Sequence, residues 1–256
     1  PPTAGREMFY DNADNRKIYV YDTFLSNYKM ADNWSKYADS IVGYSSLNKD
    51  PNAITFADSQ VRDICLQNWD TNKNGHLSKS EAAAVRSIGK VFQNSKISTF
   101  DEFQYFTGLG TLENLAFWQC SSLSSITLPS NLTAIGAQAF QGCISLTSLE
   151  IPNTVSSIGE YAFMKCSSLT TVNIPFYVTK LEDGLFDSCY SLRYVDIPIY
   201  LMTIGNRVFA NCESMHTVII PACVITIGDS AFANCNSLQK IAFPNSVVSL
   251  GEIGRA

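Results

Sequence analysis

A phrase of 23 residues recurs six times without a slip in the second half of the chain. Three columns keep this spacing: a phenylalanine, a cysteine three residues later, and a proline nine residues after the cysteine. The phenylalanines are Phe117, Phe140, Phe163, Phe186, Phe209 and Phe232. The cysteines are Cys120, Cys143, Cys166, Cys189, Cys212 and Cys235, and the prolines are Pro129, Pro152, Pro175, Pro198, Pro221 and Pro244. A fixed period of this length predicts a solenoid in which each repeat forms one coil.

Apolar residues recur at fixed places between the cysteine and the proline, for example Leu146, Leu149 and Ile151. The last two are two residues apart, so both point inward on a short strand and the residue between them points outward. Proline then ends the strand because it lacks the N–H group of the ladder. A second apolar pair, such as Val155 and Ile158, supplies the opposite wall. Coils stacked about 4.8 Å apart would bury these faces in one continuous core.

A glycine follows the second apolar pair at five places, namely Gly136, Gly159, Gly205, Gly228 and Gly251. We expect it to permit a tight turn. The fourth repeat departs from the pattern, because Glu182 stands where glycine is expected. The last repeat, "SVVSLGEIGRA", lacks its phenylalanine, so we expect the final coil to fray or to form an atypical cap.

The cysteine column has three possible meanings: disulfides, a metal site or packing. Disulfides would join neighbouring coils two by two and so break the equivalence of the coils, and one cysteine per repeat lacks the C-x-x-C spacing of zinc sites. Cysteine is among the most readily buried residues. We therefore predict a file of buried free thiols, and we expect Cys65 and Cys223 to be packing residues as well.

The repeats resemble the BspA-like, or Treponema pallidum type, leucine-rich repeats of bacterial surface proteins. The resemblance is carried by "LTSLEIPNTVSSIGEYAFMKCSS" and its five companions, about half of the chain. It implies an α+β fold, a leucine-rich-repeat solenoid of six 23-residue coils. It also implies a cell-surface or secreted bacterial protein that adheres to host matrix proteins or to other bacteria.

Residues 70–81 read "DTNKNGHLSKSE" and resemble the loop of an EF-hand, in which alternating oxygen ligands wrap a Ca²⁺ ion. The candidate ligands are Asp70, Asn72, Asn74, His76 (through its backbone carbonyl), Ser78 and Glu81. With only two carboxylates, the site should be weak, with a Kd on the order of 10⁻⁴ to 10⁻³ M. The alternative is a turn held by the hydrogen bonds of its own Asn and Asp side chains.

The flanks of this loop predict short helices. One precedes the loop and is capped by Asp58, and another, "SEAAAVRSIG", ends at Gly89. The following "KISTFDEFQYF" resembles the second half of another EF-hand, in which Ile97 would pair as a strand with Leu77.

A solenoid end exposes a bare core and needs a cover. We expect Phe103, Phe106 and Leu109 to supply it, so that residues 51–112 form a helical, EF-hand-like capping module before the solenoid at residues 113–256. Residues 17–44, "KIYVYDTFLSNYKMADNWSKYADSIVGY", resemble the strand and helix that close many BspA-like arrays. They define a first unit at residues 1–50, and "NKDPNA" at residues 48–53 is the expected boundary.

Composition excludes several functions. A formal charge of -5 and a pI near 5.0 argue against a nucleic-acid surface. No apolar run approaches the ~18 residues of a membrane span. The chain contains only two histidines, His76 and His216, and no evident catalytic set, so we predict that it is not an enzyme. The start lacks the layout of a signal peptide, so any targeting peptide is expected to have been removed or to lie upstream.

The outward strand positions would form the binding surface of a solenoid. They make two rows: Thr127, Glu150, Asn173, Asp196, Ile219 and Ala242, and Ser125, Ser148, Thr171, Tyr194, Thr217 and Lys240. Aromatic residues gather in repeats three to five, and aromatic enrichment is a feature of interface cores. The predicted partner-binding residues are Phe176, Tyr177, Tyr190, Tyr194, Asp196 and Tyr200. The alternatives to a protein-binding adhesin are a structural spacer and a dockerin-like anchoring module.

Overall fold

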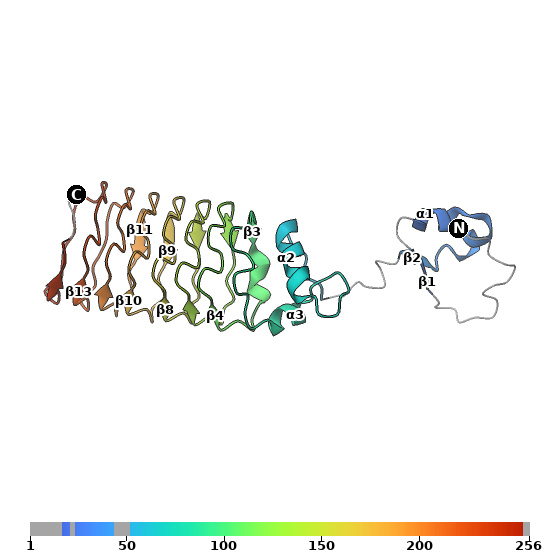
Figure 1. Ribbon diagram of the computed structural model, residues 1–256, viewed down its shortest axis with the longest axis horizontal. Coiled ribbons are helices and arrows are strands. Elements are labelled where there is room, and N and C mark those ends of the chain that lie inside the picture. Colours follow the sequence, from blue (N-terminus) through green and yellow to red (C-terminus); the bar gives the residue numbers. More distant parts are fainter. Residues whose placement is uncertain (1–16, 21–23, 44–51, 253–256) are drawn as a thin grey trace.

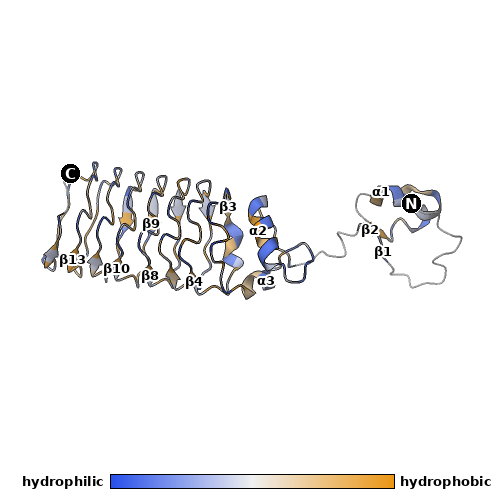
Figure 2. Cartoon of the chain, viewed as in Figure 1, coloured by the Kyte–Doolittle hydropathy of each residue, from blue (hydrophilic) through white to orange (hydrophobic). Residues whose placement is uncertain are grey.

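The computed structural model describes residues 17–20, 24–43 and 52–252. From residue 52 onward the chain forms an elongated solenoid whose coils stack side by side, with helices α2 and α3 at one end (Figure 1). We number the coils by their phenylalanine, so that coil one contains Phe117 and coil six contains Phe232. Hydrophilic and hydrophobic stretches alternate along each coil (Figure 2).

Short parallel strands form two ladders along the solenoid. The first ladder has two paired groups, β3 (Thr99–Phe100) with β5 (Ser125–Ile126), and β7 (Ser148–Leu149) with β9 (Thr171–Asn173) and β11 (Tyr194–Asp196), and β5 does not pair with β7. The second contains β4 (Thr111–Leu112), β6 (Ala134–Ile135), β8 (Ser157–Ile158), β10 (Lys180–Leu181), β12 (Thr203–Ile204), β13 (Thr226–Ile227) and β14 (Ser249–Leu250). Partners such as Thr203 and Thr226 are one repeat apart, so the period of the sequence sets the register.

The phenylalanine column is a continuous stack of rings. From coil one to coil six, neighbouring ring centroids lie 5.4–5.7 Å apart and the ring planes differ by 7–19°. Each cysteine thiol donates to the carbonyl of the phenylalanine one coil back, as Cys166 does to Phe140 at 3.2 Å. The six thiols are buried and unpaired, as predicted. Cys65 is also buried, whereas the prediction for Cys223 is wrong, because its turn leaves it exposed.

Two positions per coil hold the left-handed backbone conformation. They lie two residues before and two residues after the phenylalanine: Leu115, Gln138, Tyr161, Gly184, Arg207 and Ser230, and Gln119, Gly142, Lys165, Ser188, Asn211 and Asn234. This conformation turns their amides toward the following coil, as in the 2.8 Å bond from the Lys165 N–H to the Asp187 carbonyl. Hydrogen bonds therefore join neighbouring coils on this side as well as along the ladders.

The glycines of this column allow close packing against the preceding coil, and the predicted tight turn at these positions is wrong. Its φ angles are not in the left-handed region, but a Cβ atom on Gly228 would lie 2.6 Å from the backbone nitrogen of Asn206. The glycine amide donates to the previous coil, as Gly205 does to Leu181 at 2.8 Å. At Glu182 the described residues show no equivalent bond, and β8 does not pair with β10. The second ladder is thus divided at the coil in which Glu182 replaces the glycine.

A coil that the period does not reveal precedes coil one. Phe92 stacks on Phe117 at 5.3 Å, and the Cys120 thiol donates to the Phe92 carbonyl at 3.0 Å. Ser95 takes the place of the cysteine, with its Oγ 3.4 Å from the Cys120 sulfur. We call this unit coil zero; β3 and β4 belong to it.

The prediction that residues 96–106 form the second half of another EF-hand is wrong, because these residues belong to coil zero. Ile97 is buried in the solenoid core and does not pair with Leu77, whose carbonyl instead accepts the Ile54 N–H. The strand that follows Ile97, β3, pairs with β5 of coil one.

Helices cover the N-terminal end of the solenoid, but the predicted boundary between cap and solenoid at residue 113 is too late, because β3 and β4 already belong to coil zero. Helix α2 (Ser59–Trp69) is capped by Asp58, and helix α3 (Lys79–Ala84) ends before the expected Gly89. The 3₁₀ helix η4 (Asp101–Tyr105) follows β3. Phe103, Phe106 and Leu109 are fully buried, and Trp69 packs edge-on against Phe106 at 5.3 Å.

Residues 17–43 contain β1 (Ile18–Val20), α1 (Leu25–Met30), the 3₁₀ helix η2 (Asp32–Tyr37) and β2 (Ile41–Gly43). β1 and β2 are parallel, and Ile18 pairs with Ile41 at a separation equal to the solenoid period. Trp34 and Ile41 form a small core of their own. Of the expected boundary at residues 48–53, residues 48–51 lie outside the described residues.

Glu182→Gly should close the gap in the second ladder. Regained ladder hydrogen bonds at about 0.5–1.5 kcal/mol each outweigh the entropic cost of one glycine, about 0.5–1 kcal/mol. We expect the melting temperature to rise by about 2–4 °C, together with slower amide hydrogen exchange in β10. The control, Glu213→Gly at an exposed turn, repairs no ladder and should lower the melting temperature slightly. A fall for Glu182→Gly would contradict the packing account.

Candidate protein-binding surface

The first ladder presents its outward residues to solvent, as the alternation predicts. Glu150, Asp196 and Ile219 are exposed, while the flanking Leu149 and Ile151 are buried. The outward row continues into coil zero, where Asp101 follows β3 and its carboxylate accepts the Thr127 hydroxyl at 3.3 Å. The row therefore runs from Asp101 in coil zero to Ala242 in coil six.

Two shallow hollows lie on this face. The larger, of about 520 Å³, is lined by residues that include Asp101, Glu150 and Asn173. The smaller, of about 210 Å³, shares Glu150 and Asn173 and adds Tyr194 and Asp196. The Asn173 amide is fixed in place, because it accepts the Ile151 N–H at 2.8 Å and donates to the Ile151 carbonyl at 2.9 Å. Both hollows are open to solvent, which suits a macromolecule better than an enclosed small molecule.

The structure divides the predicted aromatic patch into two parts. Phe176 meets Tyr177 and Tyr200 edge-to-face, with ring centroids 5.5 Å and 4.9 Å apart. These three residues lie in the turns that follow the prolines of coils three and four. Among the described rings, Tyr190 and Tyr194 make no contact with them, since Tyr190 precedes β11 and Tyr194 begins it.

The first part extends into an apolar ridge that a search for aromatic residues missed. We name it the turn ridge, and its members are 38–66% exposed: Phe176, Tyr177, Ile199, Tyr200, Met202 and Ile225. The equivalent positions of coils one and two are all polar: Ser130, Asn131, Thr133, Asn153, Thr154 and Ser156. The coil fold therefore does not require apolar residues here. The ridge could have been found by comparing the polarity of equivalent turn positions from repeat to repeat.

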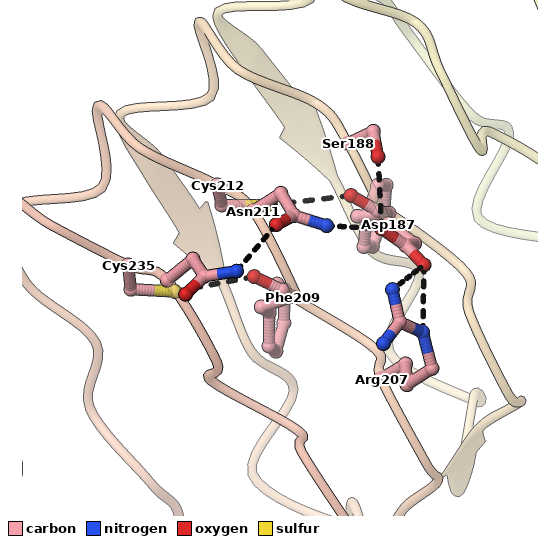
Figure 3. Close-up of polar contacts among 9 residues, drawn as sticks. Asp187, Ser188, Arg207, Phe209, Asn211, Cys212 and Cys235 are labelled. Carbon is pink, nitrogen blue, oxygen red and sulfur yellow. Dashed lines mark hydrogen bonds and ion pairs between the residues drawn. The ribbon is translucent and has the colours of Figure 1, made fainter. Parts of the chain in front are cut away.

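A buried carboxylate that the sequence did not single out lies in coil four (Figure 3). Asp187 accepts two bonds from the Arg207 guanidinium at 2.8 and 2.9 Å and one from the Asn211 amide at 2.9 Å. The Ser188 hydroxyl donates at 2.9 Å. These donors satisfy the charge and join coil four to the next coil. Asp187 is therefore a structural acid, with no free oxygen aimed at a substrate.

Five of the six candidate calcium ligands lie on the loop between α2 and α3, and the sixth, Glu81, lies in the first turn of α3. Asp70 accepts the N–H groups of Asn74 and Gly75 at 3.2 and 2.9 Å, and the Asn74 side chain accepts the His76 N–H at 2.8 Å. Such bonds hold side-chain oxygens along the inside of the loop, as an EF-hand requires. No three His, Cys, Asp or Glu side chains of the described residues are grouped as metal ligands.

Glu81 closes the loop from the first turn of α3. Its carboxylate accepts the Thr71 and Ser78 backbone N–H groups at 3.0 and 2.9 Å and the hydroxyls of both residues. Partial burial by itself would raise the pKa of Glu81, but the hydrogen bonds from Ser78, Thr71 and Asn72 outweigh it and lower the pKa to about 2. The loop thus has its own hydrogen-bonded closure, with which a cation would compete.

The repeats and their packing place the chain among leucine-rich-repeat solenoids. The profile of the BspA type leucine rich repeat region matches residues 86–216 and 202–253, with six copies. The chain belongs to this family of leucine-rich-repeat proteins, which is non-catalytic. The match begins at residue 86, before coil zero.

Solved structures of bacterial relatives are similar. A leucine rich cell surface protein from Faecalibacterium prausnitzii A2-165 is 34% identical over 64% of this chain, with a TM-score of 0.52. A leucine-rich repeat protein from Eubacterium ventriosum ATCC 27560 is 29% identical over 60% of this chain, with a TM-score of 0.54. The matches span 43% and 41% of those two chains. A T. pallidum leucine rich repeat protein is 37% identical over 42% of this chain and 50% of its own, with a TM-score of 0.41.

A search of curated proteins found no match. Among the described residues, no helix has the length and apolar character needed to cross a membrane.

The closure of the loop by Glu81 predicts a pH dependence of stability. Because folding lowers the pKa of Glu81 from 4.5 to about 2, its contribution is fully present above about pH 4.5 and is lost as the pH falls toward 2. In urea unfolding between pH 7 and pH 2, Glu81→Gln should be less stable at pH 7 and should lose less stability in this window than the wild type. Glu213→Gln, at an exposed turn, serves as the control. Parallel curves for wild type and Glu81→Gln would contradict the closure.

Proposed function

We propose that this chain is a non-catalytic protein-binding region of a bacterial cell-surface or secreted protein, and that it binds its partner through the turn ridge and the adjoining face of coils two to five. The observation that carries the proposal is the change from polar to apolar turn residues between coils two and three. In a repeat whose backbone is the same from coil to coil, this change is the mark of selection for a surface.

The composition of the ridge supports a protein partner. Exposed Tyr and Phe residues offer large apolar area at low conformational cost, and such residues dominate binding hot spots. The edge-to-face contacts of Phe176 hold its ring between Tyr177 and Tyr200 before any partner arrives. The relative from F. prausnitzii is described as a cell surface protein, and the family resemblance favours host matrix proteins or other bacterial surface proteins as partners. A spacer role would leave the ridge without a purpose.

The test is capture of the purified chain on immobilised matrix proteins and on intact bacterial cells. Phe176→Ser with Tyr200→Ser should weaken capture at least about tenfold, as expected for the loss of two hot-spot residues. Both side chains are about half exposed, so the fold should survive. The control is Glu213→Ser, at an exposed turn outside the ridge and outside the lining of both hollows. The proposal would be overturned if the wild type and the ridge variant were captured equally well.

We propose in addition that the loop at residues 70–81 binds one Ca²⁺ ion weakly and thereby stiffens the capping module. The ligands would be the side-chain oxygens of Asp70, Asn72, Asn74, Ser78 and Glu81 and the His76 carbonyl. The convergence of the Asp70, Asn72 and Asn74 oxygens on the loop's own N–H groups supports this role. The dockerin-like alternative requires two such loops, and the segment expected to supply part of a second one belongs to coil zero.

Calcium should raise the melting temperature by a few degrees. At 10 mM Ca²⁺ and a Kd of about 10⁻³ M, binding adds about 1.4 kcal/mol. Asp70→Ala should remove the shift, and Mg²⁺ at the same concentration should produce a smaller one, because it prefers a tighter, octahedral set of ligands. The proposed metal site would be contradicted if Ca²⁺ shifted the melting temperatures of the wild type and Asp70→Ala equally.

A further inference from the structure

We propose that the occupant of this surface is an extended, positively charged polypeptide that runs along the solenoid axis over coils two to five. This inference rests on the proposed binding function and adds the chemical class of the partner. It is carried by the arrangement of charges beside the turn ridge.

Acidic residues occupy every second coil of the outward row that borders the ridge. Asp101, Glu150 and Asp196 stand in coils zero, two and four, with the neutral Thr127 and Asn173 between them. Asp196 precedes the ridge residue Ile199 by three positions, so the acidic row and the ridge run side by side. Within the described part of the chain, neither Glu150 nor Asp196 takes part in an ion pair. Their charges are therefore available to a partner.

No free cation of the protein neutralises this strip among the described residues. Lys180, close to the ridge in sequence, is held by Glu182 at 2.5 Å. Arg193 precedes β11, at the end of the strand opposite to Asp196 and the ridge, and Lys240 belongs to coil six. A partner with basic side chains therefore complements the strip, whereas an acidic partner is repelled.

The distance between the acidic side chains of the row matches the repeat of an extended polypeptide. Neighbouring strands lie about 4.8 Å apart, so carboxylates two coils apart are separated by about 10 Å. A polypeptide in the polyproline II conformation rises about 3.1 Å per residue and has three residues per turn, so every third residue recurs on the same side at about 9 Å. A segment with Lys or Arg at every third position would place them opposite Glu150 and Asp196. Its intervening apolar or proline residues would pack on Tyr200, Ile199 and their neighbours.

Three labelled 18-residue peptides test this match by fluorescence anisotropy with the full chain. The first repeats Pro-Leu-Lys, the second repeats Pro-Leu-Glu, and the third has the composition of the first with all lysines at one end. We expect the first to bind at least tenfold more tightly than the second and several-fold more tightly than the third. We also expect its affinity to fall as salt rises.

Variants locate the binding. Glu150→Gln with Asp196→Asn should weaken the spaced-lysine peptide about three- to tenfold and reduce its salt dependence, while the control Glu213→Gln should have no effect. Phe176→Ser with Tyr200→Ser should abolish binding. Equal affinity for the lysine and glutamate peptides, or no effect of the double charge variant, would overturn the inference.

The outcomes separate this inference from the proposed function. If the ridge variant loses protein capture but the peptides are not discriminated, the cationic-chain inference falls and the binding function stands. If capture is indifferent to the ridge, both fall. Concentration-dependent dimers in sedimentation that the ridge variant abolishes would identify a second copy as the occupant and would also overturn the inference.

Discussion

The structure depends on the contact between each coil and the next through the phenylalanine stack and the cysteine thiols. A ring in one coil stacks on the rings of the neighbouring coils, and a thiol donates to a carbonyl of the coil before it. The left-handed positions add amides that point to the coil after. No coil is complete alone, so the N-terminal end needs the cover that coil zero and the helical module supply.

Because the coils repeat, equivalent surface positions can be compared from one coil to the next. Inward columns are constrained by packing and are nearly invariant between coils, whereas outward columns are free to change. A difference within one exposed column, such as Asn153 in coil two against Phe176 in coil three, is therefore not required by the fold. The buried Asp187 is the opposite case: its charge is absorbed by Arg207 and Asn211 and serves cohesion between coils.

Much of the fold follows from spacing in the sequence, because a fixed period places equivalent residues at equivalent points. The thiol file, the inward strand pairs and the cover by Phe103 and Phe106 were predictable in this way. Coil zero was not, since Ser95 replaces its cysteine and its spacing departs from the period. The left-handed positions could not be predicted, because residue types such as Lys165 and Tyr161 do not favour a positive φ angle. Half of the turn ridge was missed because Ile199, Met202 and Ile225 are not aromatic.

The reactivity of the cysteines tests the stacked core most directly. Burial raises the pKa of Cys166 to about 12 and that of Cys235 to about 11, so these thiols stay protonated and covered near neutral pH. Of the eight cysteines, a thiol reagent applied to the native chain should modify Cys223 alone at once, and the other seven should react only as the chain unfolds. Rapid modification of two or more members of the six-cysteine column, or disulfides between them, would contradict the account.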